Sequence, residues 1–407
     1  RTKRLPVVST AAWPMALPKA GAAPRTGSPT LDTECALLYT SGTTGRPKGC
    51  VLSNFYMLNG GAWYRDLGGR LAAQHGRDRI LNPLPLFHMN CLGITGTRVI
   101  LTASCLILPE RFSPRRWWPD VVATRATAIH YLGVMPPLLL NQAPCPEERE
   151  HRVRFGLGAG VEPQLHEAFE KRFGFPLVEV WGMTETGRIY ADREEPRQIH
   201  TRAFGRPHGG FEARVVDDAD RELPPGADGE LLVRWGGAEG PRHGFFSGYL
   251  KDPRATDEAW RGGWFHTGDT VRQEPDGMLI FVDRKKNITR RSGENVAAAE
   301  VEAVLQAHEA VAQVAVLAVP DEVREEEVMA CVVAMPGVKA DAALGGALMD
   351  WSLARLAYFK APGWILFVER LPTTGTQKVQ KTQIFPKDED PRRRPGALDL
   401  RERKKRS

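Results

Sequence analysis

The sequence contains no long apolar run, and none of its hydrophobic stretches approaches the roughly 20 residues of a membrane-spanning helix. An integral membrane segment is therefore not expected. The six cysteines are scattered, and no Cys-x-x-Cys or His-x-x-x-His spacing occurs, which argues against a structural zinc site. Scattered thiols without a disulfide framework are typical of a reducing compartment, so we expect a cytoplasmic protein.

A secretory signal is not expected either. Residues 1–4, Arg-Thr-Lys-Arg, are followed by a stretch that Pro6, Pro14 and Pro18 interrupt, in place of a continuous apolar core. The composition, with 42% hydrophobic and 26% charged residues, is that of an ordinary soluble globular protein. A chain of 407 residues is long enough for two or three domains.

The net charge of +6 is unevenly distributed, because basic residues are concentrated at positions 392–394 and 401–406. A basic tail can bind nucleic acid or anionic lipid. This one has few apolar residues and no interleaved aromatic residues, which favours a solvated, disordered tail over residues 389–407. We therefore expect no nucleic-acid partner.

The richest chemical signal is the stretch at residues 39–49, which reads Tyr-Thr-Ser-Gly-Thr-Thr-Gly-Arg-Pro-Lys-Gly. An apolar run at residues 36–39 precedes it and predicts a buried strand. Residues 50–52 predict a second strand, and a helix-compatible run begins at Asn54. Glycine lets the backbone approach a ligand, while hydroxyl and cationic side chains bind phosphate oxygens. The spacing fits neither a Walker A loop nor Gly-x-Gly-x-x-Gly, but Lys48 and the dense Ser/Thr pattern favour a polyphosphate-binding loop over a flexible surface turn.

Short apolar runs alternate with helical stretches from residue 36 to about residue 182, which predicts a mostly parallel sheet covered by helices. The predicted strands are 80–84, 105–108, 128–132, 153–157 and 177–181, and a helix is predicted at 162–173. From residue 201 to 283, short strands alternate with Gly, Pro and Asp turns, which indicates a β-rich subdomain. The strands predicted there are 212–216, 230–234 and 278–282.

A charged junction, Asp-Arg-Lys-Lys-Asn at residues 283–287, ends this region. Beyond it, an amphipathic helix is predicted at 298–308 and strands at 314–319 and 328–335. We therefore expect an α/β fold: a large N-terminal domain of parallel sheets with helices plus a β-rich subdomain, and then a small mobile α+β C-terminal domain. The predicted boundaries are 1–283, 284–388 and, for the basic tail, 389–407.

Further segments carry candidate chemistry, the first of them where an apolar strand ends at Val-Trp-Gly-Met-Thr-Glu-Thr-Gly, residues 180–187. At the carboxyl end of a strand, side chains point into the ligand crevice of an open α/β sheet. The other segments are Gly-Ala-Gly (158–160), Trp-Phe-His-Thr-Gly-Asp (264–269), Pro-Leu-Phe-His-Met-Asn (85–90) and Pro-Thr-Thr-Gly-Thr-Gln-Lys-Val-Gln-Lys (372–381). Taken singly, each has a structural alternative: a core tryptophan, an ordinary turn, a β-turn aspartate, a packed histidine or a surface lysine.

Together these segments follow the order found in the class I adenylate-forming superfamily, which contains acyl-CoA synthetases, nonribosomal-peptide adenylation domains and luciferases. The chain resembles that family up to about residue 385. The resemblance implies a small-molecule carboxylic acid as substrate, ATP and coenzyme A as co-substrates, and Mg²⁺ as cofactor. It also implies that the small domain rotates between two half-reactions.

The resemblance also assigns roles to individual residues. The ATP/AMP site would comprise Thr40, Ser41, Gly42, Thr43, Thr44, Gly45, Lys48, Gly158, Ala159, Gly160, Trp181, Gly182, Met183, Asp269 and Arg284. Trp181 would lie against adenine, Thr184 would contact the α-phosphate, and Glu185 would bind Mg²⁺, which prefers oxygen ligands. Asp269 and Arg284 would hold the ribose.

Three more sites follow from the resemblance. His88 would gate the acyl pocket, and Lys286 would lie at the hinge. The turn that passes the pantetheine arm of coenzyme A would comprise Ser292, Gly293 and Glu294.

Lys378 is assigned as the adenylation lysine, whose ammonium would neutralise charge as the carboxylate attacks the α-phosphate. Family members usually have glycine before this lysine, whereas this chain has Gln377. Lys381 is the local competitor for the role.

We therefore predict an ATP-dependent acyl-CoA ligase that forms an acyl-adenylate with release of pyrophosphate and then a CoA thioester. Within the superfamily, residues 85–90 and the ending at 374–381 most resemble carnitine/crotonobetaine-type ligases. An adenylation domain that loads a carrier protein is one alternative, although no carrier-domain Ser motif is visible after residue 385. A non-catalytic nucleotide-binding remnant is the other.

The resemblance begins just ahead of the phosphate loop, and the sequence begins at Arg1, whereas family members carry a substantial earlier segment. We expect the N-terminal part of the large domain to be missing from this sequence, and the chain as given to be poorly active without it. The sequence leaves the acid and the oligomeric state open.

Overall fold

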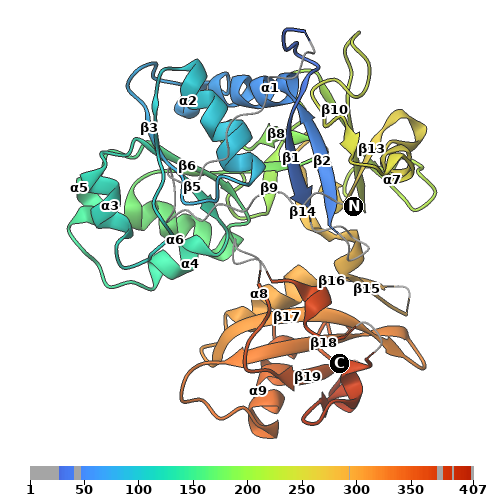
Figure 1. Ribbon diagram of the computed structural model, residues 1–407. Coiled ribbons are helices and arrows are strands. Elements are labelled where there is room, and N and C mark those ends of the chain that lie inside the picture. The colour runs from blue at the N-terminus through green and yellow to red at the C-terminus, as the bar shows by residue number, and fades with distance from the viewer. Residues whose placement is uncertain (1–26, 41–46, 293, 374–378, 387–388, 405–407) are drawn as a thin grey trace, which may run out of the picture.

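The computed structural model describes residues 27–40, 47–292, 294–373, 379–386 and 389–404, arranged as a large upper lobe and a smaller lower lobe (Figure 1). Within these ranges, no helix is both long enough and apolar enough to cross a bilayer.

A six-stranded sheet forms the centre of the large lobe, with strand order β4-β3-β5-β6-β7-β8. Its strands are β3 (Arg79–Leu81), β4 (Cys105–Ile107), β5 (Ala128–Leu132), β6 (Phe155–Ala159), β7 (Leu177–Met183) and β8 (Gly187–Ala191). All neighbouring pairs are parallel except the β7–β8 hairpin. The prediction of a mostly parallel sheet is confirmed.

Helices cover both faces of this sheet. Since successive residues of each strand point to opposite faces, neighbouring residues pack into different cores. Ile80 packs into a core that contains Tyr56 and Tyr64, while Leu81 packs into a second core that contains Trp118 and Phe169. The helices of the large lobe up to β7 are α1 (Asn54–Arg65), α2 (Thr97–Leu101), α3 (Trp117–Ala123), α4 (Met135–Leu140), α5 (Glu147–Glu150) and α6 (Pro163–Phe173), with the π-helical turn η3 (Asn90–Gly96) and the 3₁₀ turn η2 (Gly69–Leu71). Because both faces of the sheet are covered, the apolar residues of its strands occur in runs and do not alternate regularly with polar ones.

The strand before the predicted phosphate-binding loop is not buried as the sequence indicated. β1 (Glu34–Thr40) pairs with β2 (Lys48–Ser53), which pairs with β12 (Gly248–Tyr249), in a separate antiparallel sheet. Only Leu38 of the apolar run is buried, whereas Leu37 and Tyr39 are 41% and 61% exposed. The prediction was wrong because β1 is an edge strand with one open face, and a continuous apolar run does not distinguish that from a central strand.

The β-rich region forms a five-stranded antiparallel sheet of order β10-β11-β13-β14-β9. Its strands are β9 (Ala203–Gly205), β10 (Phe211–Val216), β11 (Asp228–Trp235), β13 (Phe265–Gln273) and β14 (Leu279–Arg284), accompanied by α7 (Pro253–Ala259) and the turn η4 (Arg261–Gly263). Asp252 caps α7 by accepting a hydrogen bond from the Ala255 N–H at 3.0 Å. The expected β-rich region is therefore present.

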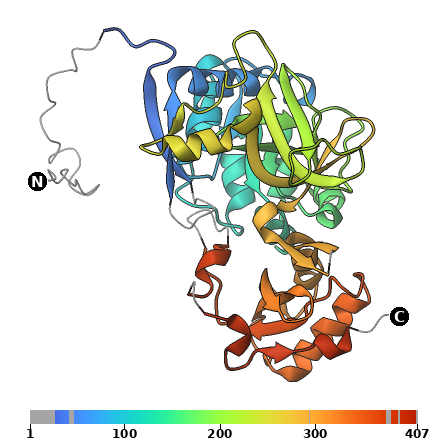
Figure 2. The ribbon, with the colours of Figure 1, turned by 90° about the vertical axis from the view of Figure 1, so that its right-hand side faces the viewer.

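The lower lobe has its own sheet and core, as both views show (Figures 1 and 2). Its strand order is β16-β15-β18-β19-β20, with β17 also paired to β18. The elements are the turn η5 (Lys285–Asn287), β15 (Ile288–Arg291), β16 (Glu294–Ala297), α8 (Ala298–Gln306), β17 (Val311–Asp321), β18 (Glu325–Ala334), α9 (Ala342–Leu353), β19 (Trp364–Phe367), η6 (Lys381–Gln383), η7 (Pro391–Arg393), β20 (Leu398–Asp399) and η8 (Arg401–Arg403). The boundary between the domains at residues 283 and 284 stays a prediction.

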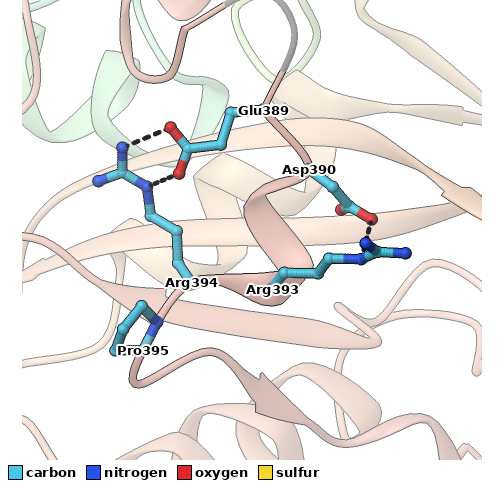
Figure 3. Close-up of a pocket in the computed structure, with 5 residues that line it drawn as sticks. All are labelled: Glu389, Asp390, Arg393, Arg394 and Pro395. Atoms are coloured by element: carbon cyan, nitrogen blue, oxygen red, sulfur yellow. Dashed lines mark hydrogen bonds and ion pairs between the residues drawn. The ribbon is translucent and has the colours of Figure 1, made fainter.

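The basic tail was predicted to be disordered, and for residues 389–404 that prediction was wrong. β20 pairs with β19, and Lys404 is only 6% exposed. Figure 3 shows the start of this segment, where Arg394 pairs with Glu389 and Arg393 with Asp390 around a small surface cavity. The arginines are ordered because carboxylates of the same lobe neutralise them, a property that composition alone does not reveal.

A buried ion cluster centred on Asp78 joins α2, β3 and the start of β6. Asp78 is 1% exposed and lies 2.7 Å from both Arg98, which is fully buried, and Arg154. Burial raises the pKa of Asp78, but hydrogen bonds from the Gln74 N–H and the two guanidinium groups outweigh this effect and hold the pKa below its usual value.

We predict that Asp78→Ala lowers the free energy of unfolding by about 3–5 kcal/mol, because it leaves the Arg98 guanidinium buried without its counter-charge. Urea unfolding followed by tryptophan fluorescence measures the change. Asp66→Ala is the matched control, since Asp66 is 58% exposed and its pair with Arg65 contributes about 0–1 kcal/mol. Equal losses in the two variants would contradict the prediction.

Candidate active site

The nucleoside side of the candidate site is built around Asp269, a carboxylate that is 3% exposed. Asp269 and Arg284 are opposite each other on the antiparallel strands β13 and β14, and Arg284 Nε lies 2.8 Å from Asp269 Oδ1. Trp181 Nε1, from β7 of the other sheet, donates to Asp269 Oδ2 at 2.9 Å. Three residues predicted to bind the nucleoside are therefore brought together from segments up to about 100 positions apart.

Trp181 is 6% exposed, and its ring stacks on Tyr190 and Phe204 with centroids 5.9 Å from each. The structure thus shows the core packing of this tryptophan and its hydrogen bond to Asp269. Its contact with adenine stays a prediction.

The turn at Gly158, Ala159 and Gly160 follows β6 and is fixed by a carboxylate that the sequence did not single out. Glu179 accepts hydrogen bonds from the Gly160 N–H at 2.6 Å and from the Tyr131 hydroxyl at 2.6 Å. Gly160 has φ +89°, in the region that favours glycine. Burial raises the pKa of Glu179 against the opposing effect of these hydrogen bonds.

The phosphate side of the site lies at the ends of β1 and β2. Thr40 and Lys48 are cross-strand partners, and the Thr40 hydroxyl donates to the Lys48 carbonyl at 3.5 Å. The expected phosphate-binding residues between them, Ser41, Gly42, Thr43, Thr44 and Gly45, lie outside the described residues.

Thr184 and Glu185 occupy the turn of the β7–β8 hairpin, after Gly182 and Met183 end β7. The Thr184 carbonyl accepts a hydrogen bond from the Tyr56 hydroxyl at 2.8 Å, and the Glu185 carbonyl accepts one from the Phe246 N–H at 2.9 Å. Tyr56 of α1 and Phe246, which precedes β12, therefore both hold the turn, and Glu185 is only 4% exposed.

Tyr249, which sequence reasoning missed, connects the phosphate side to this turn. Its hydroxyl donates to Glu185 Oε1 at 3.0 Å, and the Lys48 ammonium lies 4.7 Å from its ring centroid. Tyr249 is held there because β12 pairs with β2, opposite Cys50. Burial, and secondly the Glu185 carboxylate, raise the pKa of Cys50 and that of Tyr249, so both groups stay neutral.

Glu185 fits a magnesium ligand. Mg²⁺ is usually bound by one or two carboxylates together with substrate phosphates and water. Within the described ranges, no group of three or more His, Cys, Asp or Glu side chains is placed to hold a metal ion without such help. A single buried carboxylate beside the ends of the phosphate loop is consistent with an ion shared with ATP.

Glu230, which is 7% exposed, is a second residue that sequence reasoning missed, and it lies next to the Asp269–Arg284 pair. It accepts from the Gly268 N–H at 3.2 Å and from Lys285 Nζ at 2.9 Å, next to Asp269 and Arg284 respectively. Burial raises the pKa of Glu230, but His266 and Lys285 outweigh that effect and lower it to about 2. No local sequence pattern pointed to Glu230 or to Tyr249, since the donors and acceptors of the three hydrogen bonds given for these side chains lie 38, 55 and 64 positions apart in the sequence.

The residues predicted for the acyl pocket, the hinge and the coenzyme A turn have no described contact with the Asp269 or Glu185 groups. His88 is half-buried with its ring 4.9 Å from that of Phe87, and burial lowers its pKa, so it is neutral at pH 7. Lys286 lies in the η5 turn, and Ser292 and Glu294 flank the turn between β15 and β16. Gly293 and Lys378 lie outside the described residues, as does the side chain of Lys286.

Known protein families and relatives match most of the chain. The family described as AMP-binding enzyme matches residues 3–250, and its C-terminal domain matches residues 300–378. The crotonobetaine/carnitine–CoA ligase of Proteus mirabilis is 31% identical over 359 residues, which cover 87% of this chain and 67% of the relative. The sulfoacetate–CoA ligase of Cupriavidus necator is 32% identical over 368 residues, covering 88% and 68%. The chain thus spans about two thirds of the length of these curated relatives.

Solved structures show the same fold. ATP-bound MatB from Rhodopseudomonas palustris superposes with a TM-score of 0.76 at 28% identity, covering 89% of this chain and 70% of that one. The o-succinylbenzoate–CoA synthetase MenE from Bacillus subtilis, in complex with AMP, gives a TM-score of 0.73 at 29% identity, with coverages of 87% and 69%.

The fold and the relatives identify the class of this protein as the AMP-forming acid–thiol ligases. These enzymes make acyl-CoA from a carboxylic acid through an acyl-adenylate. The chain belongs to the AMP-binding enzyme family. ATP and coenzyme A are accordingly its co-substrates, and the predicted α/β fold with a large N-terminal and a small C-terminal part is confirmed.

We predict that Tyr249→Phe slows adenylation about 10- to 100-fold, because the loss of a hydrogen bond to a charged group costs about 1.5–3 kcal/mol. The exchange of pyrophosphate into ATP, measured over a range of Mg²⁺ concentrations, reports the effect. Tyr190→Phe is the control, since its hydroxyl donates to the Glu212 carbonyl and has no contact with Glu185. Similar rates for both variants would remove Tyr249 from the site.

Proposed function

We propose that the described residues divide the work of the ligase between two steps, adenylation on the large lobe and thioester formation at the turn between β15 and β16. The observation that carries the proposal is the convergence of the Asp269–Arg284 pair, Trp181 and the Glu185–Tyr249–Lys48 group along one strand end and its hairpin turn. Trp181 and Glu185 are four positions apart, so the residues proposed to bind the nucleoside lie next to those proposed to bind the phosphates.

In the first step, the ribose hydroxyls would bind Asp269, whose carboxylate can accept two hydrogen bonds, with Arg284 beside it. Thr40, Lys48 and the loop between them would bind the phosphates, and Thr184 the α-phosphate. The small residues of the 158–160 turn would leave room for the purine. These contacts hold the α-phosphorus near the attacking carboxylate, so that positioning supplies much of the rate.

Mg²⁺ held by Glu185 would neutralise phosphate charge when bound. Lys378 would stabilise the charge that develops as the acid attacks the α-phosphorus and pyrophosphate leaves. His88 would face the acyl group as a neutral imidazole. In the second step, the thiol of coenzyme A would attack the acyl carbon of the acyl-adenylate beside Ser292 and Glu294, the bond from that carbon to the phosphate oxygen would break, and AMP would leave, with Lys286 at the hinge. The scattered free thiols support a cytoplasmic enzyme.

The acid is the open part of the proposal. A panel that begins with carnitine, crotonobetaine, sulfoacetate and o-succinylbenzoate, the acids named for the relatives, is assayed for pyrophosphate exchange without coenzyme A and for thioester formation with it. Exchange that needs no coenzyme A, followed by thioester when it is added, supports the proposal. Exchange without any thioester would favour an enzyme that loads a carrier protein.

We predict that Lys378→Ala abolishes adenylation but leaves thioester formation from supplied acyl-adenylate largely intact, since the lysine acts only in the first step. Lys381→Ala is the matched control. Lys381 Nζ lies 2.7 Å from Glu302 Oε1, and burial raises the pKa of this carboxyl. Removing the Lys381 ammonium should therefore lower the melting temperature of the protein and leave adenylation unchanged. If Lys381→Ala were the inactive variant, the lysine assignment would be reversed.

We predict that Glu185→Gln slows adenylation about 10²-fold and shifts the Mg²⁺ requirement upward, because the amide keeps the shape but loses the charge. Titration of pyrophosphate exchange with Mg²⁺ measures both. An unchanged Mg²⁺ dependence would exclude Glu185 from the metal site.

A further inference from the structure

The segment at residues 390–404, which we call the strap, crosses the lower lobe and binds it through a row of basic side chains. β20 within the strap pairs with β19, where Ile365 is opposite Leu398. Around this short strand, the charged contacts of the strap reach three places: the turn between β17 and β18, a buried carboxylate on β18, and Asp350 of α9.

At the turn between β17 and β18, the strap binds both carboxylates. Arg401 Nη1 lies 2.9 Å from Asp321 Oδ2, and Arg392 Nη1 lies 3.1 Å from Glu322 Oε1. The other oxygen of Asp321 accepts the Val323 N–H at 3.1 Å and thereby shapes the turn. The strap therefore holds a turn whose own backbone depends on the carboxylate that it binds.

On β18 the strap reaches the interior. Lys404 Nζ lies 2.6 Å from Glu327 Oε1, and neither side chain has any exposed area. Burial lowers the pKa of Lys404 to about 8, against the attraction of Glu327. Arg291 Nε, at the end of β15, lies 2.8 Å from the other oxygen of Glu327 and is 3% exposed. One buried carboxylate thus joins the strap to β15.

The turn before β18 and the start of β18 also accept hydrogen bonds from the backbone of the β15–β16 hairpin. The Ser292 N–H donates to the Arg324 carbonyl at 3.2 Å, and the Arg290 N–H donates to Glu326 Oε2 at 2.6 Å. Ser292 has φ +50° and Glu325 has φ +66°, backbone conformations that side-chain-bearing residues adopt only with support from their surroundings. The hairpin is thus bonded to the turn before β18 and to the start of β18, and Glu327 of β18 is bound both by Lys404 of the strap and by Arg291 of β15.

We propose that the strap is a positioning element for the coenzyme A half-reaction: through Glu327 and the turn between β17 and β18 it holds the β15–β16 hairpin in place. This inference rests on the proposed function, in which Ser292 and Glu294 adjoin coenzyme A only in the second step. Adenylation uses groups of the large lobe together with Lys378, none of which has a described contact with Arg401 or Lys404.

Two strap variants and one control on the same strap test the proposal. Lys404→Met removes the buried charge and keeps the apolar stem, and Arg401→Gln releases Asp321 at a side chain that is 31% exposed. Arg403→Gln is the control, because Arg403 binds Asp350 of α9 at 2.9 Å and does not contact the turn or Glu327. Each chain is assayed for pyrophosphate exchange with the best acid of the panel, and for thioester formation from the matching acyl-adenylate over a range of coenzyme A concentrations.

We expect Lys404→Met and Arg401→Gln to lower kcat/KM for coenzyme A about tenfold, since a misplacement of about 1 Å can cost up to about 10²-fold. Pyrophosphate exchange should stay within about twofold of the wild-type rate, and Arg403→Gln should change neither step. Amide hydrogen exchange gives a readout that is independent of activity: the N–H groups of Arg290 and Ser292 should exchange faster in the two strap variants than in the control.

Parallel loss of both half-reactions, or an equal effect of Arg403→Gln, would overturn the proposal. If Lys404→Met does not fold, Arg401→Gln decides, because its site is at the surface. Absence of pyrophosphate exchange in the wild-type chain would instead agree with the poor activity expected of the chain as given and would leave hydrogen exchange to decide: faster exchange at the hairpin in the two strap variants than in the control supports the positioning role, and equal exchange overturns it.

Discussion

The carboxylate of Asp269 is the point on which the arrangement of the site depends. A buried carboxylate must be paired or hydrogen-bonded, because an isolated charge in the interior costs many kcal/mol. Its partners here come from β7 of the six-stranded sheet and from β14 of the five-stranded sheet. Satisfying one charge therefore fixes the two sheets relative to each other, and it does so where Arg284 leads into the lower lobe.

A second connection repeats the principle on the phosphate side. β2 and β12 come from positions about 200 residues apart, and their pairing places Tyr249 between Lys48 and Glu185. The two groups share β7 and its turn, so a displacement of that strand would move both. Hydrogen bonds from Tyr56 and Phe246 to the turn after β7, and from the Gly160 N–H to Glu179, hold the ends of β6 and β7 in place.

Much of this could be predicted from the sequence, and the limits have physical causes. Period-2 and apolar patterns are local, so β5, β6 and β7 were predicted within about two residues of their ends. The motif residues were found through resemblance, and the structure brings Trp181, Asp269 and Arg284 together. Tyr249 and Glu230 were missed because their significance depends on partners far along the chain.

The tail was misjudged for the same reason, since Lys404 gains its partner from Glu327, 77 positions earlier. The coarse architecture is therefore readable from local patterns. The polar contacts that position the site are long-range, and only the folded chain reveals them.

The open face of β1 has a consequence for handling the protein. β1 ends its sheet in the described part of the chain, and Leu37 and Tyr39 point away from the core on a strand whose outer backbone groups face no neighbouring strand of that sheet. Such an edge is a template for pairing with another extended chain, and apolar side chains strengthen the association. Concentrated solutions of the chain should therefore self-associate through this strand before the rest of the molecule unfolds, and a lysine in place of Tyr39 is the direct remedy.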